Sequence, residues 1–396
     1  MVGLLAAAQA VRSAGDALAI DEGREAALLR AAGDGFQIKR TPHFIIAYDT
    51  DRDLVDELTG RLEQTYHAVH HFCEMNGIEA RGLDRRLEVV FFNHRASYDR
   101  YSAGIGFRSA GTYGLYFEPT NRSAFYNAIN DPELVQLHAE IVGARSSLDD
   151  LSRAVNDIKG SRTQVEIEFA DGRRISGPKA EVKRVVAKEI ESARDKLHAL
   201  DARRKACCAR INQTVIQHET AHQVLFNAGV HVRGAMNPRW LVEGLACLFE
   251  TPPGGLGTGM AAINQARLKD IRSTVSSRRN KRRLTSEDFV QAVSDGRLTP
   301  PPRLVADPGL FDERGDRGAI HYAAAWAMTH YLQRTKTAEL AAYLKVLSRR
   351  RPGFRPTPAS EVALFEAHFG PLDETFLRRW GGYILNLHYR PVKGDP

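Results

Sequence analysis

The sequence has no apolar segment long enough to cross a lipid bilayer, so we expect no transmembrane segment. Its four cysteines show no paired metal-binding spacing, and they imply no disulfide framework. Two of them, Cys207 and Cys208, are adjacent in a helical pattern, so we expect at least one to be inert core. No internal repeat is visible. The composition is that of an ordinary globular protein. The chain is long enough for two or three structural units with a hydrophobic core.

An excess of charge of one sign is also missing, because the formal net charge is only +7. The densest basic run lies at residues 278–283, between two expected helices. No nucleic-acid-binding module accompanies it, so we interpret it as a solvated linker and expect no nucleic-acid partner.

The first ten residues lack the basic stretch that normally opens a signal peptide. They do hold a short apolar run and Ala8-Gln9-Ala10, which matches an A-x-A cleavage pattern. Two interpretations stay open: an amphipathic start of a cytoplasmic protein, or a truncated signal peptide. The cleavage pattern favours the second, which predicts an exported, periplasmic protein.

The densest cluster of candidate metal ligands lies between residues 211 and 250, where HETAH forms an HExxH motif. Positions i and i+4 share one face of a helix, so His218 and His222 can direct both imidazoles at one cation. Glu219 lies beside them, where its carboxylate can deprotonate an attacking water. A catalytic zinc ion takes three protein ligands and keeps one position open, so one ligand is still to be found.

Glu243, which follows the second histidine by twenty-one residues, is the candidate for that ligand. Asn237 and Pro238 are typical of an N-cap followed by proline at the first helical position, which predicts a helix over about residues 239–250. Glycines in the preceding link suit a helix end and a turn. Such a helix–loop–helix unit would let Glu243 face the histidine pair.

An ordinary helix with two surface histidines is the alternative, since a chance HExxH is expected in on the order of a few per hundred such chains. The flanking residues favour a metal, because they predict a largely buried helix. They are Val215, Ile216, Val224, Leu225 and Phe226. A buried His-Glu-His cluster needs a partner for its charges, which a cation supplies. We therefore expect one Zn²⁺ ion per chain.

HETAHQVLFNAG followed by PRWLVEGLACLFE resembles the gluzincin clan of zinc metallopeptidases. More closely, the chain resembles a bacterial group of peptidase-MA-like domains with HExxH, W-L-x-E-G-x-A and a later tyrosine helix. The likeness covers about residues 40–130 and 211–390. It implies that the two motif histidines and Glu243 bind zinc, and that Glu219 is the general base. It also implies hydrolysis of peptide bonds in a peptide or protein substrate.

A second zinc-peptidase clan does not fit, and one position departs from the gluzincin pattern. The metzincin pattern does not fit, because it requires glycine and histidine where this chain has Leu225 and Ala228. Thermolysin-like enzymes carry a histidine-orienting carboxylate four residues after the ligand glutamate, where this chain has Cys247. Glu250 is our candidate for this supporting role.

A non-catalytic, metal-stabilised scaffold that binds a protein partner is the alternative function.

The resemblance also points to His321 and Tyr322. The related group carries a tyrosine at this place, and in the aminopeptidase branch a comparable tyrosine stabilises the oxyanion. Tyr322 would contribute about 3 kcal/mol in that role if it behaves like other oxyanion donors. His321 could act from the neighbouring face. Structural packing of Tyr322 against Trp326 stays open as the alternative.

Two aromatic-rich runs, 111–117 and 123–128, predict a hairpin around Pro119. In gluzincins, an edge strand upstream of HExxH pairs with the extended substrate through main-chain hydrogen bonds. The resemblance therefore implies a substrate-binding edge strand here, formed by Ser123, Ala124, Phe125, Tyr126 and Asn127. An ordinary interior strand with aromatic packing is the open alternative.

Residues 131–210 differ from the rest of the chain. Apolar residues recur there at alternating steps of three and four, on both sides of an expected strand pair. The first stripe is Leu134, Leu137, Ile141, Ala144, Leu148, Leu151, Val155 and Ile158. This pattern predicts an antiparallel coiled-coil hairpin with a small β tip, inserted before the HExxH helix. It could dock a protein partner or gate the cleft, or it could be a passive arm.

Together these patterns predict an α+β, predominantly helical fold with a thermolysin-like, gluzincin-like core. The expected parts are an N-terminal helical segment (1–38), a mixed α/β subdomain with a small sheet (39–130), the inserted hairpin (131–210), the zinc-binding helix pair (211–255) and a helical C-terminal subdomain (256–396).

Overall fold

The computed structural model describes residues 18–109, 111–157, 163–168, 172–209, 214–251, 262–276 and 283–389. Over these residues the protein is predominantly helical with a small mixed sheet, which confirms the predicted fold class at that level. None of the described helices combines the length and the apolar character needed to cross a membrane. The N-terminal cleavage pattern and most of the basic run at 278–283 lie outside the described residues.

The main sheet has five strands in the order β1-β2-β3-β5-β4. Their bounds are β1 Gln37–Arg40, β2 Phe44–Tyr48, β3 Leu87–Phe92, β4 Gly114–Phe117 and β5 Arg122–Tyr126. The three central strands, β2, β3 and β5, run parallel, and each outer strand pairs antiparallel with its neighbour. Strand β1 lies partly within the segment expected to be helical, and its four residues carry too little apolar pattern to predict it.

Side-chain alternation along the strands gives the sheet two apolar faces. On one face, Ile45 and Ala47 pack with α1 (Glu22–Ala32) and α3 (Arg95–Gly104). On the other, Phe44 and Ile46 pack with α2 (Arg52–Met75) and α6 (Ile216–Asn227), the HExxH helix. Helix α2 therefore supports the helix that carries the motif.

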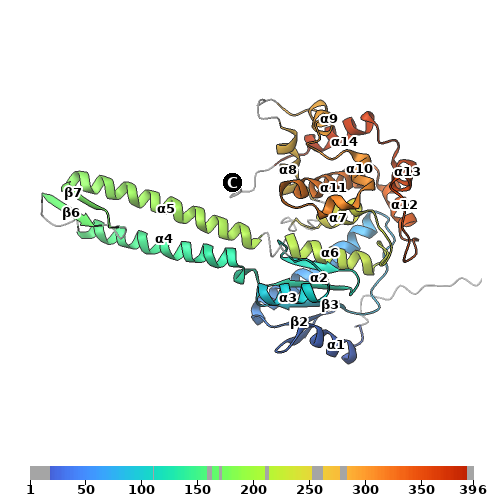
Figure 1. Cartoon of the computed structure of the whole chain (residues 1–396), viewed down its shortest axis with the longest axis horizontal. Coiled ribbons are helices and arrows are strands. Elements are labelled where there is room, and N and C mark those ends of the chain that lie inside the picture. The colour runs from blue at the N-terminus through green and yellow to red at the C-terminus, as the bar shows by residue number, and fades with distance from the viewer. Residues whose placement is uncertain are drawn as a thin grey trace, which may run out of the picture.

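An arm formed by α4 (Pro132–Asp157) and α5 (Lys179–Ala209) projects from the body (Figure 1). Its tip is the antiparallel pair β6 (Gln164–Glu168) and β7 (Arg174–Pro178). One apolar cluster closes the base of the arm around Leu137 and Ile141, and another closes the tip around Val182 and Val186. Over the described residues the predicted helical stripes and strand pair are thus present, while Ile158, the last position of the first stripe, lies outside them. The join to α6 falls at residues 210–213, outside the described residues.

The rest of the chain is helical in its described parts. Its helices are α7 (Arg239–Cys247), α8 (Gln265–Val275), α9 (Ser286–Ser294), α10 (Pro301–Ala306), α11 (Gly315–Thr335), α12 (Thr337–Leu347), α13 (Pro358–Phe369) and α14 (Glu374–Asn386). Short 3-10 segments lie at Ala128–Asn130 and Pro308–Asp312.

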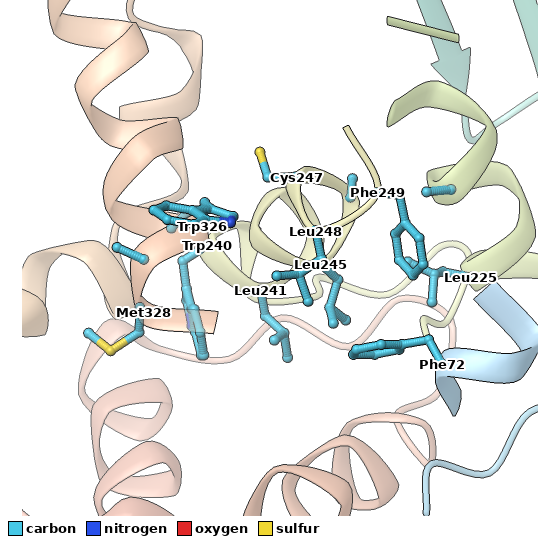
Figure 2. Close-up of a cluster of buried hydrophobic side chains, with 14 of the residues drawn as sticks. Phe72, Leu225, Trp240, Leu241, Leu245, Cys247, Leu248, Phe249, Trp326 and Met328 are labelled. Atoms are coloured by element: carbon cyan, nitrogen blue, oxygen red, sulfur yellow. The ribbon is translucent and has the colours of Figure 1, made fainter. Parts of the chain in front are cut away.

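Helix α7 lies at the centre of the main core. Its side chains meet Trp326 and Met328 of α11 on one side, and Phe72 of α2 and Leu225 of α6 on the other (Figure 2). A Cβ added at Gly244 would collide with Thr329 Oγ1 and the Ala325 carbonyl oxygen. Glycine at this position therefore permits α7 and α11 to cross closely, directly beside Glu243.

Two details of α7 differ from the prediction. The residue before the helix is Pro238, while the Asn237 side chain turns back to accept from Val232 N and donate to the Val232 carbonyl. The prediction of Asn237 as the N-cap is therefore wrong, because its amide stabilises the preceding loop instead. The helix also ends at Cys247, and the chain turns before Glu250.

Candidate metal centre

Three buried side chains converge at one point. His218 Nε2 and His222 Nε2 lie 3.0 Å apart, and each lies 3.2 Å from Glu243 Oε2. A tetrahedral zinc ion with bonds of about 2.0–2.1 Å separates its ligand atoms by about 3.3 Å. The triangle of donor atoms therefore has the size that such an ion requires. The imidazole rings lie nearly perpendicular, at 87°, which fits two ligands approaching one ion from different directions.

The sheet holds the histidine helix in place. Gln223, one residue after His222, is fully buried; its amide donates to the carbonyl oxygens of Glu88 and Asn121 and accepts from Ser123 Oγ. These hydrogen bonds tie α6 to strands β3 and β5 across the sheet. Rotation of α6 about its axis would break them, so the two histidines keep one orientation.

Glu250 contacts His218 on the side of the ring opposite Glu243. Glu250 Oε1 lies 3.1 Å from His218 Nδ1, the ring nitrogen that faces away from Glu243. The carboxylate also accepts from Arg267 Nη2 at 2.8 Å and from Asn264 Nδ2 at 2.7 Å, both near the start of α8. A ligand histidine commonly donates its second N–H to such a carboxylate, which fixes the tautomer. The geometry places Glu250 where the sequence predicted it, because the turn after Cys247 brings it back to α6.

His218, Cys247 and Glu250 form a second group close enough to share a cation. Arg267 lies within 2.8 Å of the Glu250 carboxylate, and the guanidinium would repel a metal ion there. Cys247 Sγ donates to Glu250 Oε1 at 3.3 Å, and burial raises the pKa of the thiol to about 11. Cys247 therefore stays a protonated donor, and His218, His222 and Glu243 are the better group for an ion.

The electrostatic field of the triad suits a cation. Burial acts to raise the pKa of Glu243, but the charge of His222 and hydrogen bonds from both histidines hold this pKa well below its usual value. Arg239, one turn earlier on α7, lies 3.2 Å from Glu243 Oε1 and leaves Oε2 to the histidines. Burial lowers the pKa of His218, and its hydrogen bonds to Cys247, Glu243 and Glu250 raise it well above normal. Without a metal, protons must fill the place between these donors.

The edge of the sheet borders the centre. Glu219 is half-buried, and its Oε2 accepts the backbone N–H of Tyr116 in β4 at 2.7 Å. This N–H therefore points away from β5 and toward α6. A Cβ at Gly114 would collide with the Phe125 ring and Val215, so glycine lets β4 approach both its neighbour strand and the start of α6.

The prediction that residues 123–127 supply an edge strand is wrong. Strand β5, which contains Ser123, Ala124, Phe125 and Tyr126, pairs with β3 on one side and β4 on the other. Its backbone groups are committed to these ladders, and Asn127 N donates to the Phe92 carbonyl. All four side chains are buried, a pattern on both faces that is typical of an interior strand. Among the strands that the structure describes, β4 is the one that lies beside the HExxH helix and pairs with another strand along one edge only.

Helix α11 brings Tyr322 to the centre and turns His321 elsewhere. The Tyr322 ring centroid lies 6.2 Å from that of His218. The charge of Glu243 and burial both raise the pKa of Tyr322, so its phenol stays protonated. The ring packs against Phe311, at 5.4 Å, while the Trp326 ring contacts His330. His321 is buried, with Nδ1 2.7 Å from Thr299 Oγ1 and Nε2 3.3 Å from Glu313 Oε2, so it does not share the position of Tyr322.

Several residues of the centre were not found from the sequence. Arg239 could have been, because it precedes Glu243 by four residues on one helix. Arg267 had no local signal; its guanidinium reaches Glu250 and lies 5.5 Å above the Tyr322 ring. His231 is buried beside Phe226, and burial together with the charge of His222 lowers its pKa to about 3. It is therefore a neutral neighbour of the triad.

Comparison with known proteins adds one finding. Residues 212–353, which contain all of α6, α7 and α11, match the model of a family described as a protein of unknown function (DUF1570). The matched segment includes His218, His222, Glu243 and Tyr322. No curated protein and no solved structure matches the chain.

Proposed function

We propose that the protein is a zinc-dependent metallopeptidase built on a gluzincin-like core. The observation that carries this proposal is the buried triangle of His218 Nε2, His222 Nε2 and Glu243 Oε2, with sides of 3.0–3.2 Å. Imidazole and carboxylate ligands suit zinc, and three protein ligands leave one position for reaction. A non-catalytic scaffold would need only the three metal-binding side chains. Glu219 and Tyr322 beside it favour an enzyme.

A zinc ion held by these residues would polarise the scissile carbonyl and lower the pKa of a bound water to about 7. Glu219 lies next to the ligand histidines and is half-buried. Its carboxylate would take a proton from the attacking water and later pass it to the leaving amine. Its hydrogen bond from Tyr116 N holds one carboxylate oxygen in position and leaves the other for this transfer.

Tyr322 would donate its phenolic hydrogen to the oxygen of the carbonyl under attack. The raised pKa of Tyr322 keeps this hydrogen in place at neutral pH. Arg267 links this group to the ligand set, because its guanidinium contacts both the Tyr322 ring and Glu250. The donor and the supporting carboxylate are thus held by one side chain.

Strand β4 supplies the main-chain surface for the substrate. It pairs with β5 along one edge only, and the N–H of Tyr116 on its other edge points to Glu219. Because Glu219 already accepts the N–H of Tyr116, an extended peptide would add through the other main-chain groups of this edge, antiparallel or parallel, and would bring a peptide bond near the centre. This mode favours an unfolded or extended segment of a peptide or protein.

The test is Glu219→Gln. The amide keeps the shape of the side chain but cannot accept a proton, so turnover should fall by about 10²–10⁴-fold. Zinc content, measured on the purified protein, should equal that of the unchanged protein because Glu219 is not a ligand. Cleavage is followed on a broad peptide library by mass spectrometry.

The matched control is Glu181→Gln, which makes the same change at an exposed position of α5. It should cleave the library like the unchanged protein. Full activity of Glu219→Gln would show that another group is the base. An unchanged protein that holds zinc but cleaves nothing in the library would favour the scaffold.

A further inference from the structure

A second group of metal-binding side chains lies where α2 passes the start of β2. It consists of His43, directly before β2, and Glu63 and His67, one turn apart on α2. One ligand atom from each residue lies within 4.8 Å of the other two. The group shares no residue with the candidate metal centre.

Two of the three donors are already fixed. Glu63 Oε1 accepts the backbone N–H of His43 at 2.9 Å, and Glu63 Oε2 lies 2.6 Å from His43 Nδ1. The ring of Tyr66 stacks on the His43 imidazole at 3.7 Å, which fixes the plane of that ring. The backbone bond and the stacking would persist if the proton between Nδ1 and Oε2 were replaced by an ion.

The third donor is exposed and adjustable. The His67 ring centroid lies 5.3 Å from that of His43, at an angle of 89°. His67 is a surface residue, so rotation of its side chain can shorten the distance to the other two donors at little cost. The site is therefore open to solvent, and water can fill the remaining coordination positions.

The donor set selects the kind of ion. Two imidazoles and one carboxylate suit zinc and its neighbours among the divalent transition metals, whereas calcium and magnesium prefer oxygen alone.

We propose that His43, Glu63 and His67 form a second, solvent-accessible binding site for a divalent transition-metal ion of the zinc type. The ion would link α2 to His43, the residue directly before β2. Helix α2 also packs on the zinc-binding unit, since Phe72 contacts Phe249 with ring centroids 5.5 Å apart. Occupancy would therefore stabilise the support of the first centre without taking part in its chemistry.

The test is the zinc stoichiometry of the full chain after equilibrium dialysis at on the order of 10 µM free Zn²⁺. The unchanged protein should bind two ions per chain, and His67→Ala should bind one. Since His67 is exposed, its loss should leave the circular dichroism spectrum unchanged. The matched control is His71→Ala, which removes another exposed histidine of α2, one turn later. It should bind two ions.

A second measurement uses the melting temperature, because an ion that binds only the folded chain raises it. The second equivalent of Zn²⁺ should raise the melting temperature of the unchanged protein and of His71→Ala, but not of His67→Ala. The proposal would be overturned if His67→Ala still bound two zinc ions. It would also be overturned if His71→Ala lost one zinc ion, as His67→Ala is expected to do.

The two sites can be told apart with His222→Ala. This variant should lose the ion of the first centre and keep the one that depends on His67. Failure of the first centre to bind zinc would refute the proposed peptidase and leave the second site standing. Loss of both ions together in His67→Ala would instead contradict two independent sites.

Discussion

The body and the arm of this molecule bury their side chains to very different degrees. Every residue of α7 except Arg239 is buried, and Trp240, Leu241 and Leu245 have no exposed surface. In the arm, the buried side chains form two small clusters, one at the base and one at the tip, and most other positions of α4 and α5 face solvent. The arm even exposes Val135 and Val142, each by more than half.

This difference decides where chemistry can be built. A site for metal-dependent chemistry is favoured where water is excluded and neighbouring side chains hold the charged groups in place. The triad in the body meets both conditions, because hydrogen bonds through Gln223 and Glu250 fix its donors. The arm meets neither. We therefore expect changes in the body to abolish function and changes in the arm to leave the chemistry intact.

The largest effect should come from His222→Ala. It removes one corner of the triangle and leaves Glu243 and His218 without the geometry for zinc, so the protein should lose the ion of the triad and all measurable turnover. The melting temperature should also fall, since bound metal stabilises the folded state. Metal analysis and thermal melts check this.

His330→Ala is the control for that change, because His330 is a buried histidine of α11 whose ring contacts Trp326 rather than the triad. It creates a cavity and should destabilise the protein, but zinc should remain. If His222→Ala binds as many zinc ions as His330→Ala, the triad is not the ligand set.

Tyr322→Phe comes next. It deletes one hydroxyl and keeps the ring between Phe311 and Arg267. If the phenol stabilises the oxyanion, kcat should fall by about 10²–10³-fold while zinc content stays the same. Tyr383→Phe removes a comparable hydroxyl that binds His330, and it should leave kcat unchanged. Equal rates for the two variants would assign Tyr322 a packing role.

The sequence was informative wherever the pattern is local. The spacing of His218 and His222 puts both on one face of a helix, and the structure brings their Nε2 atoms to 3.0 Å. The heptad stripes predicted the two helices of the arm, and strand β6 and strand β7 were found between them. Each of these features depends on residues a few positions apart, where periodicity determines the neighbours.

The sequence was uninformative where distant segments meet. Nothing near Arg267 signals its ion pair with Glu250, because α7 and α8 are joined through residues that carry no such pattern. The order of the strands is equally non-local: β4 follows a loop yet forms the edge, and β5 lies inside. The hairpin was predicted, but its orientation on the sheet depends on pairing with β3, more than thirty residues earlier.

Glu250→Gln should have a smaller effect than the changes above. The amide cannot hold the negative charge that faces His218 and Arg267, so zinc affinity should fall by about 10–100-fold. Competition with a chromophoric chelator measures it. Glu361→Gln is the matched control, because Glu361 forms a similarly buried ion pair with Arg350 on another helix. That variant should lose stability only. If Glu250→Gln and Glu361→Gln bound zinc with equal affinity, Glu250 would have no supporting role in zinc binding.

The smallest effect should follow from shortening the arm. The start of α4 and the end of α5 lie together at its base, since Leu134 and Leu137 share a cluster with Cys207. A short glycine–serine linker in place of residues 135–205 can therefore close the gap without moving α6. The arm contains none of the triad residues and neither Glu219 nor Tyr322. Zinc content should therefore equal that of the unchanged protein, and peptide turnover should stay within about twofold.

The same variant also decides what the arm is for. If it cleaves short peptides normally but loses activity on a folded or large protein substrate, the arm recruits or admits that substrate. If both activities are normal, the arm has no part in hydrolysis, and the contrast between a catalytic body and an independent arm holds. Loss of short-peptide turnover with zinc still bound would break that contrast, because it would show that the arm shapes the centre from outside its contacts.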